Sequence, residues 1–172
     1  RRFARRGCEI QRPRSLPARL CRSLASGRSK TDAAARPAAR DVFETNRRLG
    51  RGMNIGNALE GPREGAWGVM IQDYYFSLIR KAGFDSVRIP IKWSAHAELN
   101  APYAIDPEFM ARIDAVVDQA LKAGLAVVIN IHHFEEMDKA PLEHRARLVG
   151  LWRQIATHFK NRPVDVVFEI LN

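Results

Sequence analysis

Apolar side chains recur at helical spacing in three stretches of the chain, and a short apolar run follows each stretch. In a helix that packs through one face, apolar residues return every three or four positions. The apolar positions are Ile71, Tyr74, Tyr75, Leu78, Ile79 and Ala82; then Phe109, Ile113, Val116, Val117 and Ala120; and last Leu148, Trp152, Ile155 and Phe159. The spacing predicts three amphipathic helices that alternate with strands.

Local signals at the ends of the first two stretches also favour helices. Asp106 suits an N-cap and Pro107 suits the first helical position of the second stretch. Gly83 and Gly124 follow the first and second stretches, where the end of a helix favours a residue that tolerates positive φ. The similar segments 81–84 and 122–125 begin 41 residues apart. The chain therefore repeats a helix, turn and strand unit.

Four strand-like runs, at 51–57, 85–90, 127–129 and 166–168, complete the pattern. The last two do not alternate with polar residues, as in parallel strands that helices cover. A (β/α)8 barrel takes about 250 residues. We therefore predict an α/β fold for residues 41–172: the first half, about four strands, of a (β/α)8 TIM barrel truncated after strand four. The alternative is a flavodoxin-like or Rossmann sheet, but the sequence has no Gly-rich phosphate loop after a first strand.

Half of a barrel leaves two strand edges unpaired and an inner face uncovered. Unpaired edges are templates for pairing with another chain. We therefore expect poor solubility and self-association through the open barrel edges.

The charge of the chain lies almost entirely in residues 1–40, which hold eleven Arg and one Lys against two acidic residues. Residues 41–172 hold 16 basic and 17 acidic residues, so the predicted folded domain is close to neutral. The basic segment is rich in Arg, Ser, Ala and Pro and is predicted to be disordered. It contains both cysteines, Cys8 and Cys21, and no apolar run typical of a secretory signal. Its composition is similar to that of a transit peptide, but a partial gene product or translated upstream sequence is the favoured explanation.

Polar and aromatic side chains follow the carboxyl ends of the predicted strands, where active sites of (β/α)8 barrels form. Along the chain they are Asn57 and Glu60; Arg88, Trp93 and His96; His132 and His133; and Asn172. Four separate strand ends therefore present polar groups toward one place.

Four motifs at these ends resemble glycoside hydrolase family 5, the cellulase family. They are Val87-Arg88-Ile89-Pro90, the run Ile129-Asn130-Ile131-His132-His133, the run Phe168-Glu169-Ile170-Leu171-Asn172, and the run from Met53 to Glu60. The resemblance covers about residues 49–172. It implies a retaining glycosidase in which one Glu protonates the glycosidic oxygen and a second attacks the anomeric carbon. The family places the first directly after Asn172 and the second on strand seven, so neither catalytic Glu is assigned in this chain.

The resemblance also implies supporting roles for three residues. Arg88 would orient the nucleophile carboxylate, His132 would bind sugar hydroxyls and Asn172 would contact the sugar 2-hydroxyl. For Arg88 an ion pair in the barrel floor remains the alternative. Glu169 is expected to be a buried partner of Arg88 or of another base in the barrel interior. The other candidates for substrate binding are His133, Asn57, Glu60, Trp67, Trp93 and His96. For the two Trp residues, packing at the rim is an equal alternative to stacking on a sugar ring, and for Glu60 the alternative is a solvated loop charge.

The crowding of His132, His133, Glu135 and Glu136 raises the question of a metal site. Adjacent His residues on a regular strand point to opposite faces, and no zinc-protease motif is present. Glu135 and Glu136 are expected to be solvated loop charges. We predict no metal and no cofactor. The expected partner is a β-linked polysaccharide or oligosaccharide, with no specific nucleic acid and no membrane, and the cellular compartment is left open.

Two functional hypotheses follow. The first is a family 5 type hydrolase of a β-glycan such as a β-1,4-linked glucan, of which this is the N-terminal half and which is inactive as a 172-residue chain. The second is a non-catalytic half-barrel that binds glycans weakly, or whose Arg-rich segment binds acidic polymers. The sequence downstream of Asn172 discriminates between them, because the enzyme requires Glu directly after it and another Glu on a later strand.

The uneven charge generates a first prediction. Deletion of residues 1–40 is expected to abolish nonspecific retention on DNA while leaving the far-UV circular dichroism of the remaining domain unchanged, because the excess positive charge lies in the deleted segment. A shortened chain that still binds DNA at the same salt concentration would contradict this.

Overall fold

A computed structural model describes residues 41–172. The predictions made for residues 1–40, namely disorder and the positions of Cys8 and Cys21, lie outside the described residues.

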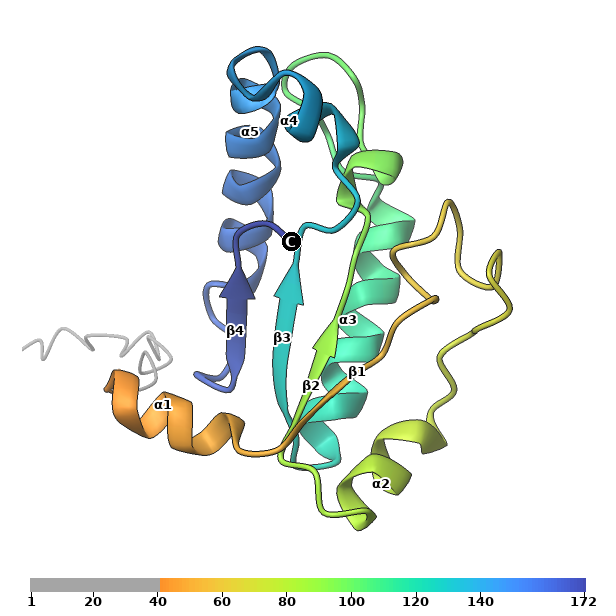
Figure 1. The fold of residues 1–172 in the computed structure, drawn as a ribbon, viewed down its shortest axis with the longest axis vertical. Coiled ribbons are helices and arrows are strands. Elements are labelled where there is room, and N and C mark those ends of the chain that lie inside the picture. Colours follow the sequence, from red (N-terminus) through yellow and green to blue (C-terminus); the bar gives the residue numbers. More distant parts are fainter. Residues whose placement is uncertain (1–40) are drawn as a thin grey trace, which may run out of the picture. The chain divides into compact units, whose positions relative to one another are not determined.

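The described part of the chain contains one four-stranded sheet. Its strands are β1 (Gly52–Asn54), β2 (Ser86–Ile89), β3 (Ala126–Asn130) and β4 (Val166–Glu169). They lie in the order β1-β2-β3-β4 and each neighbouring pair is parallel (Figure 1). The predicted strand order and parallel direction are therefore confirmed.

Helices connect successive strands, as the apolar spacing predicts. They are α2 (Tyr74–Lys81), the short 3-10 helix η1 (Trp93–His96), α3 (Pro107–Lys122), α4 (Glu135–Lys139) and α5 (Pro141–Phe159). The Asp106 side chain accepts a hydrogen bond from the Glu108 backbone N–H and Pro107 occupies the first turn of α3. Gly83 and Gly124 both adopt positive φ, 87° and 79°. The predicted start of α3 and both glycine turns are confirmed.

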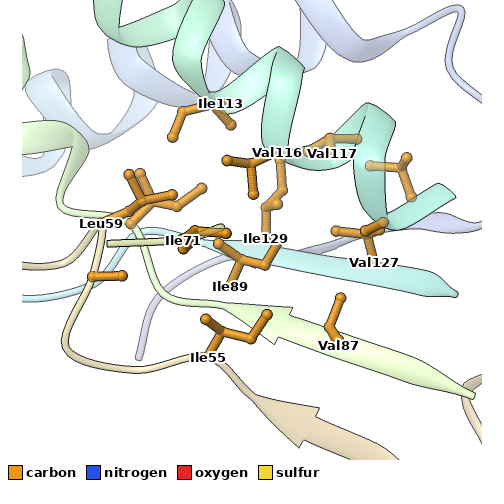
Figure 2. Close-up of a cluster of buried hydrophobic side chains, with 14 of the residues drawn as sticks. Ile55, Leu59, Ile71, Val87, Ile89, Ile113, Val116, Val117, Val127 and Ile129 are labelled. Carbon is orange, nitrogen blue, oxygen red and sulfur yellow. The ribbon is translucent and has the colours of Figure 1, made fainter. Parts of the chain in front are cut away.

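The core lies between the sheet and α3. Val87 and Ile89 of β2 and Val127 and Ile129 of β3 are completely buried and face Ile113, Val116 and Val117 of α3 (Figure 2). Successive residues of a strand point to opposite faces, so Arg88 between Val87 and Ile89 points to the other face of the sheet. Full burial of each aliphatic side chain stabilises the fold by about 1.5–3 kcal/mol. The alternation thus separates an apolar face that carries stability from a polar face.

The first predicted helix is shorter and less buried than its apolar spacing indicates. It begins at Tyr74, so Ile71 lies before it, where its backbone N–H donates to Glu64 at 2.9 Å. Tyr74 is 59% exposed and Leu78 is 53% exposed, so placing them on a buried face was wrong. The physical reason is the position of α2 at the edge of the sheet: Leu78 lines a groove of about 290 Å³ with Met53 and Ile55.

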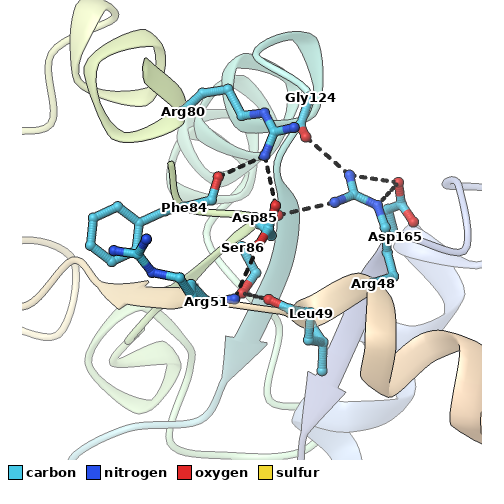
Figure 3. A network of polar contacts seen from close by, with 9 residues as sticks. All are labelled: Arg48, Leu49, Arg51, Arg80, Phe84, Asp85, Ser86, Gly124 and Asp165. Carbon is cyan, nitrogen blue, oxygen red and sulfur yellow. Dashed lines mark hydrogen bonds and ion pairs between the residues drawn. The ribbon is translucent and has the colours of Figure 1, made fainter. Parts of the chain in front are cut away.

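Sequence analysis missed the helix α1 (Val42–Leu49), which crosses below the amino ends of the strands (Figure 1). Arg48 near its end donates to the carbonyl oxygens of Asp85 at 3.1 Å and Gly124 at 3.0 Å, and forms an ion pair with Asp165 at 3.2 Å (Figure 3). Asp85 directly precedes β2, Gly124 lies just before β3, and Asp165 directly precedes β4. One guanidinium therefore holds the starts of three strands together.

Apolar side chains are exposed beside both outer strands of the sheet. Leu78 lies beside β1, while Phe168 of β4 is 40% exposed and Ile170 just after it is 68% exposed. Trp152 of α5 and Ile170 line a further groove of about 470 Å³ beside β4. These surfaces support the proposal that copies of this chain associate edge to edge.

We expect the chain to sediment as oligomers and Ile170→Lys to shift it toward monomer. Loss of about 1.5–3 kcal/mol of burial corresponds to a change of about tenfold or more in the association constant. The matched control is Leu142→Lys, since Leu142 is 87% exposed and lines a different groove, beside Tyr103. A wild-type chain that stays monomeric at high concentration and melts cooperatively would contradict the proposal.

Candidate active site

The guanidinium of Arg88 is the centre of the polar face. Its Nε and Nη2 donate to the two carboxylate oxygens of Glu169, each at 2.7 Å. Nη1 donates to Asn54 Oδ1 at 2.9 Å and Nη2 also donates to Asn172 Oδ1 at 2.8 Å. Arg88 thus joins β1, β2, β4 and the end of the described chain in one cluster.

The register of the sheet explains why these residues meet. Asn54 and Arg88 are paired residues on β1 and β2, and Asn130 and Glu169 are paired on β3 and β4. Paired residues of parallel strands share a face, and Arg88 lies on the face opposite the buried Val87 and Ile89. Backbone pairing continues past β4, where the Asn172 N–H donates to the Ile131 carbonyl oxygen at 3.1 Å.

The ion pair fixes the charge state of this face. Hydrogen bonding from Arg88 lowers the pKa of the Glu169 carboxyl, with burial acting in the opposite direction. The same hydrogen bond raises the pKa of Arg88. The sequence-based expectation that Glu169 is a partner of Arg88 is confirmed, although the Glu169 side chain is 34% exposed and so only half-buried. The orientation of a nucleophile by Arg88 stays a prediction.

His132 joins the cluster through Asn130, a residue that sequence analysis did not single out. Asn130 is completely buried, and its Nδ2 lies 3.2 Å from His132 Nδ1 and 3.4 Å from Glu169 Oε1. Burial lowers the pKa of His132, and the charges of His133 and Arg88 add to this. The polar side chain of Asn130 within an apolar strand, two positions before His132, was the available signal.

His133 does not point away from His132 as a regular strand would require. The strand ends at Asn130, and His133 adopts a left-handed backbone conformation with φ of 50°. Its ring centroid lies 4.4 Å from that of His132, so the prediction of opposite faces was wrong. Trp67, which is 46% exposed, meets the His133 ring edge-on at 5.7 Å. Trp67, His133 and His132 form an aromatic row beside the cluster.

The loop after β1 is held by Glu60, whose carboxylate was expected to be solvated or to reach a substrate hydroxyl. Glu60 is 5% exposed and its two oxygens accept hydrogen bonds from the backbone N–H groups of Asn57 and Ala58. The expectation of a solvated carboxylate was wrong because the loop folds back, with Asn57 at φ of 64°, and directs its N–H groups at this carboxylate. A contact of Glu60 with a substrate hydroxyl stays a prediction. Asn57 itself is exposed, and its role in binding stays a prediction.

Trp93 and His96 belong to the packing around α3. Trp93 is completely buried, its Nε1 donates to the Asn130 carbonyl oxygen at 3.0 Å, and its ring meets Phe109 edge-on. The prediction that Trp93 offers a face to a sugar was therefore wrong. The His96 ring stacks on Phe109 at 3.7 Å and burial lowers its pKa. Phe109 of α3 covers one face of this ring, and the contact of His96 with a substrate stays a prediction.

Glu135 and Glu136 lie in α4 and not in a loop, so that part of the expectation was wrong, but both side chains are solvated, with Glu135 52% exposed and Glu136 42% exposed. Glu135 forms an ion pair with Lys92 at 2.9 Å and Glu136 forms one with Arg147 at 3.4 Å. Within residues 41–172, His, Cys, Asp and Glu form no group of three or more that could hold a metal ion. In the same residues, every helix is too short or too polar to cross a membrane.

A parallel sheet with helices between its strands, and polar side chains gathered at the carboxyl ends of the strands, is the arrangement found in (β/α)8 barrels. The chain belongs to glycosyl hydrolase family 5: the family described as Cellulase (glycosyl hydrolase family 5) matches residues 47–172. The family predicted from the four motifs is confirmed.

Similar proteins and similar solved structures support this assignment to the family. Endoglucanase H of Acetivibrio thermocellus is 39% identical over 144 residues, which are 84% of this chain and 16% of that protein. The xyloglucan-specific endo-beta-1,4-glucanase BoGH5A of Bacteroides ovatus is 36% identical over 135 residues, 68% of this chain and 26% of that protein. A structure of Thermotoga maritima Cel5A with cellobiose is 57% identical, with a TM-score of 0.76.

The match to Cel5A covers 77% of this chain and 43% of that one. The chain therefore spans less than half the length of these relatives. Together with the strand order, this coverage confirms the predicted fold class: four strands that form the first half of a (β/α)8 barrel.

The lowered pKa of Glu169 predicts a specific dependence of stability on pH. Because the folded-state pKa lies below the ordinary value of 4.5, the ion pair contributes fully above that value. Its contribution is lost as the pH falls through the folded-state pKa. Glu169→Gln should lower the free energy of unfolding near pH 7 by about 1–2 kcal/mol, since the pair is half-buried. It should also make the loss of stability below pH ~4.5 shallower than in the wild type.

Urea unfolding at several pH values measures both effects. The control is Glu143→Gln on α5, where Glu143 is exposed, and it should change stability near pH 7 by less than about 0.5 kcal/mol. Equal acid sensitivity of Glu169→Gln and the wild type would refute the assigned charge state.

Proposed function

We propose that this chain is the amino-terminal part of a retaining glycoside hydrolase that cleaves β-linked glucan chains internally, as an endoglucanase does. The single observation that carries the proposal is the convergence of Arg88, Asn172 and, through Asn130, His132 at the carboxyl ends of parallel strands. Relatives named as endoglucanases, and a relative solved with cellobiose, support a β-glucan as the substrate.

The cluster suits the recognition of a sugar ring. Amide and imidazole groups donate and accept hydrogen bonds, which matches the hydroxyl groups of a pyranose. Asn172 would contact the 2-hydroxyl, a bond that strengthens in an oxocarbenium-like transition state. Trp67 would stack on a neighbouring ring, because it lies beside His133 with nearly half of its surface exposed. Asn57 would add a polar contact from the first strand end.

The carboxylates of this site lack the properties that the reaction requires. A general acid needs a pKa raised toward neutrality, whereas Arg88 holds the pKa of Glu169 below its ordinary value. Glu60 is occupied by two backbone N–H groups. A retaining mechanism also needs two carboxyl groups about 5–5.5 Å apart with free access to the anomeric carbon. Both catalytic Glu residues are therefore proposed to lie downstream, the acid/base directly after Asn172.

The competing function is a non-catalytic half-barrel that retains weak glycan binding. The observation that favours it is that Glu60 and Glu169, the acidic residues beside the site, both serve to hold the structure. It differs from the first proposal in the sequence that should follow Asn172.

The experiment compares two lengths of the protein. A chain of residues 1–172 is expected to release no reducing sugar from β-glucan, whereas the reading frame extended through a complete barrel is expected to release it. In the extended protein, Arg88→Ala should lower kcat by about 100-fold or more, because a misoriented nucleophile loses electrostatic and positional catalysis.

The matched control in the extended protein is Arg80→Ala, since Arg80 pairs with Asp85 near the amino ends of the strands. It should leave kcat within about threefold. Turnover by the 172-residue chain that Arg88→Ala abolishes would overturn the assignment of the catalytic groups. An extended protein without Glu after Asn172 would favour the non-catalytic function.

A further inference from the structure

We propose that Asn130 is a positioning residue that holds His132 as the neutral tautomer protonated on Nε2, so that the ring offers one N–H donor to a substrate oxygen. The inference deepens the proposed function, because His132 is the group that would meet the sugar. It assigns a role to a buried side chain that touches no substrate itself.

The first step concerns the orientation of the Asn130 amide. One amide atom lies 3.4 Å from Glu169 Oε1 and 3.2 Å from His132 Nδ1. Glu169 carries a bidentate ion pair with Arg88, so its carboxylate is ionised and can only accept hydrogen bonds. An amide oxygen in that position would face a negative oxygen. The atom facing Glu169 is therefore the NH2 nitrogen.

The second step concerns the imidazole. Because the same NH2 nitrogen faces His132 Nδ1, that ring nitrogen must present a lone pair and accept. In a neutral imidazole the other nitrogen then carries the proton. The relay runs from Arg88 through Glu169 and Asn130 to His132 over three adjacent strands. The ion pair thus fixes the Asn130 amide, and the amide leaves the Nε2–H of His132 as the hydrogen-bond donor at the strand ends.

The charged groups around His132 favour the same neutral state on balance. Burial lowers the pKa of His132, and the positive charge of Arg88 and the neighbouring His133 act in the same direction. Glu60 and Glu169 act in the opposite direction but are smaller contributions. A protonated ring would need an N–H on Nδ1, which would point at the Asn130 NH2 group. Geometry and charge therefore both favour the neutral ring over the imidazolium form.

Ring 15N NMR of the full 172-residue chain tests the inference directly, because it reports which imidazole nitrogen is protonated. The signals of His132 are identified as those missing from the His132→Gln variant. In the wild type we expect a proton on Nε2, a lone pair on Nδ1 and a pKa below the ordinary value of 6.5. The readout needs neither turnover nor glycan binding, so its failure is distinguishable from failure of the proposed function.

Two variants of similar size change the partner of Nδ1 in different ways. Asn130→Leu removes the donor, so the tautomers should mix and the pKa of His132 should rise. Asn130→Asp supplies an acceptor, so the proton should move to Nδ1 and the pKa should rise further, by on the order of one unit. If either variant fails to fold, the other still decides the question. The control is Asn54→Leu, because Asn54 contacts Arg88 in the same cluster, and it should leave the His132 tautomer unchanged.

Two results would overturn the inference. One is a wild-type His132 that carries its proton on Nδ1. The other is a folded Asn130→Leu or Asn130→Asp variant in which the tautomer and the pKa of His132 match those of the wild type.

Discussion

The structure depends on one constraint: the guanidinium of Arg88 lies within a parallel sheet and must find acceptors there. It cannot lose its proton, so it requires a carboxylate and further oxygens within hydrogen-bond distance. Glu169, Asn54 and Asn172 supply them from the neighbouring strands and the end of the described chain. Because these acceptors come from separate segments, satisfying one charge also brings the ends of the strands together.

Because side chains alternate along each strand, one face of the sheet forms the apolar core and the other face carries the polar site. Val87 and Ile89 are completely buried against α3, while Arg88 between them faces the polar cluster. At the opposite ends of the strands Arg48 of α1 binds the backbone before β2 and β3 and pairs with Asp165 before β4. The apolar layer and Arg48 hold the strands together at their amino ends. Arg88 is therefore available to the site at their carboxyl ends.

Features that depend on local sequence could be predicted, and features that depend on tertiary contacts could not. Asp106, Pro107 and the two turn glycines act within a few residues of themselves, and strand order follows from the repeated unit. The helix α1 was missed although Asp41 caps it by accepting a hydrogen bond from the Glu44 backbone N–H, because none of its residues is buried and so no buried face marks it in the sequence. The role of Trp93 was predicted wrongly because an aromatic ring can equally stack on a sugar or pack in a core. Only its contact with Phe109 in the folded structure shows that Trp93 packs in the core. The role of Asn130 needs the simultaneous positions of Glu169 and His132, which no spacing along the chain specifies.

The central claim is that the separate strand ends form one sugar-binding site. The most direct measurement is a titration of the isotope-labelled chain with cellotetraose, followed by NMR of side-chain signals. The account predicts that the Arg88 Nε–H, the Asn172 amide and the Trp67 indole respond together with one dissociation constant. Shifts confined to the groove between Tyr103 and Val149 of α5, or separate dissociation constants for Arg88 and Asn172, would contradict it.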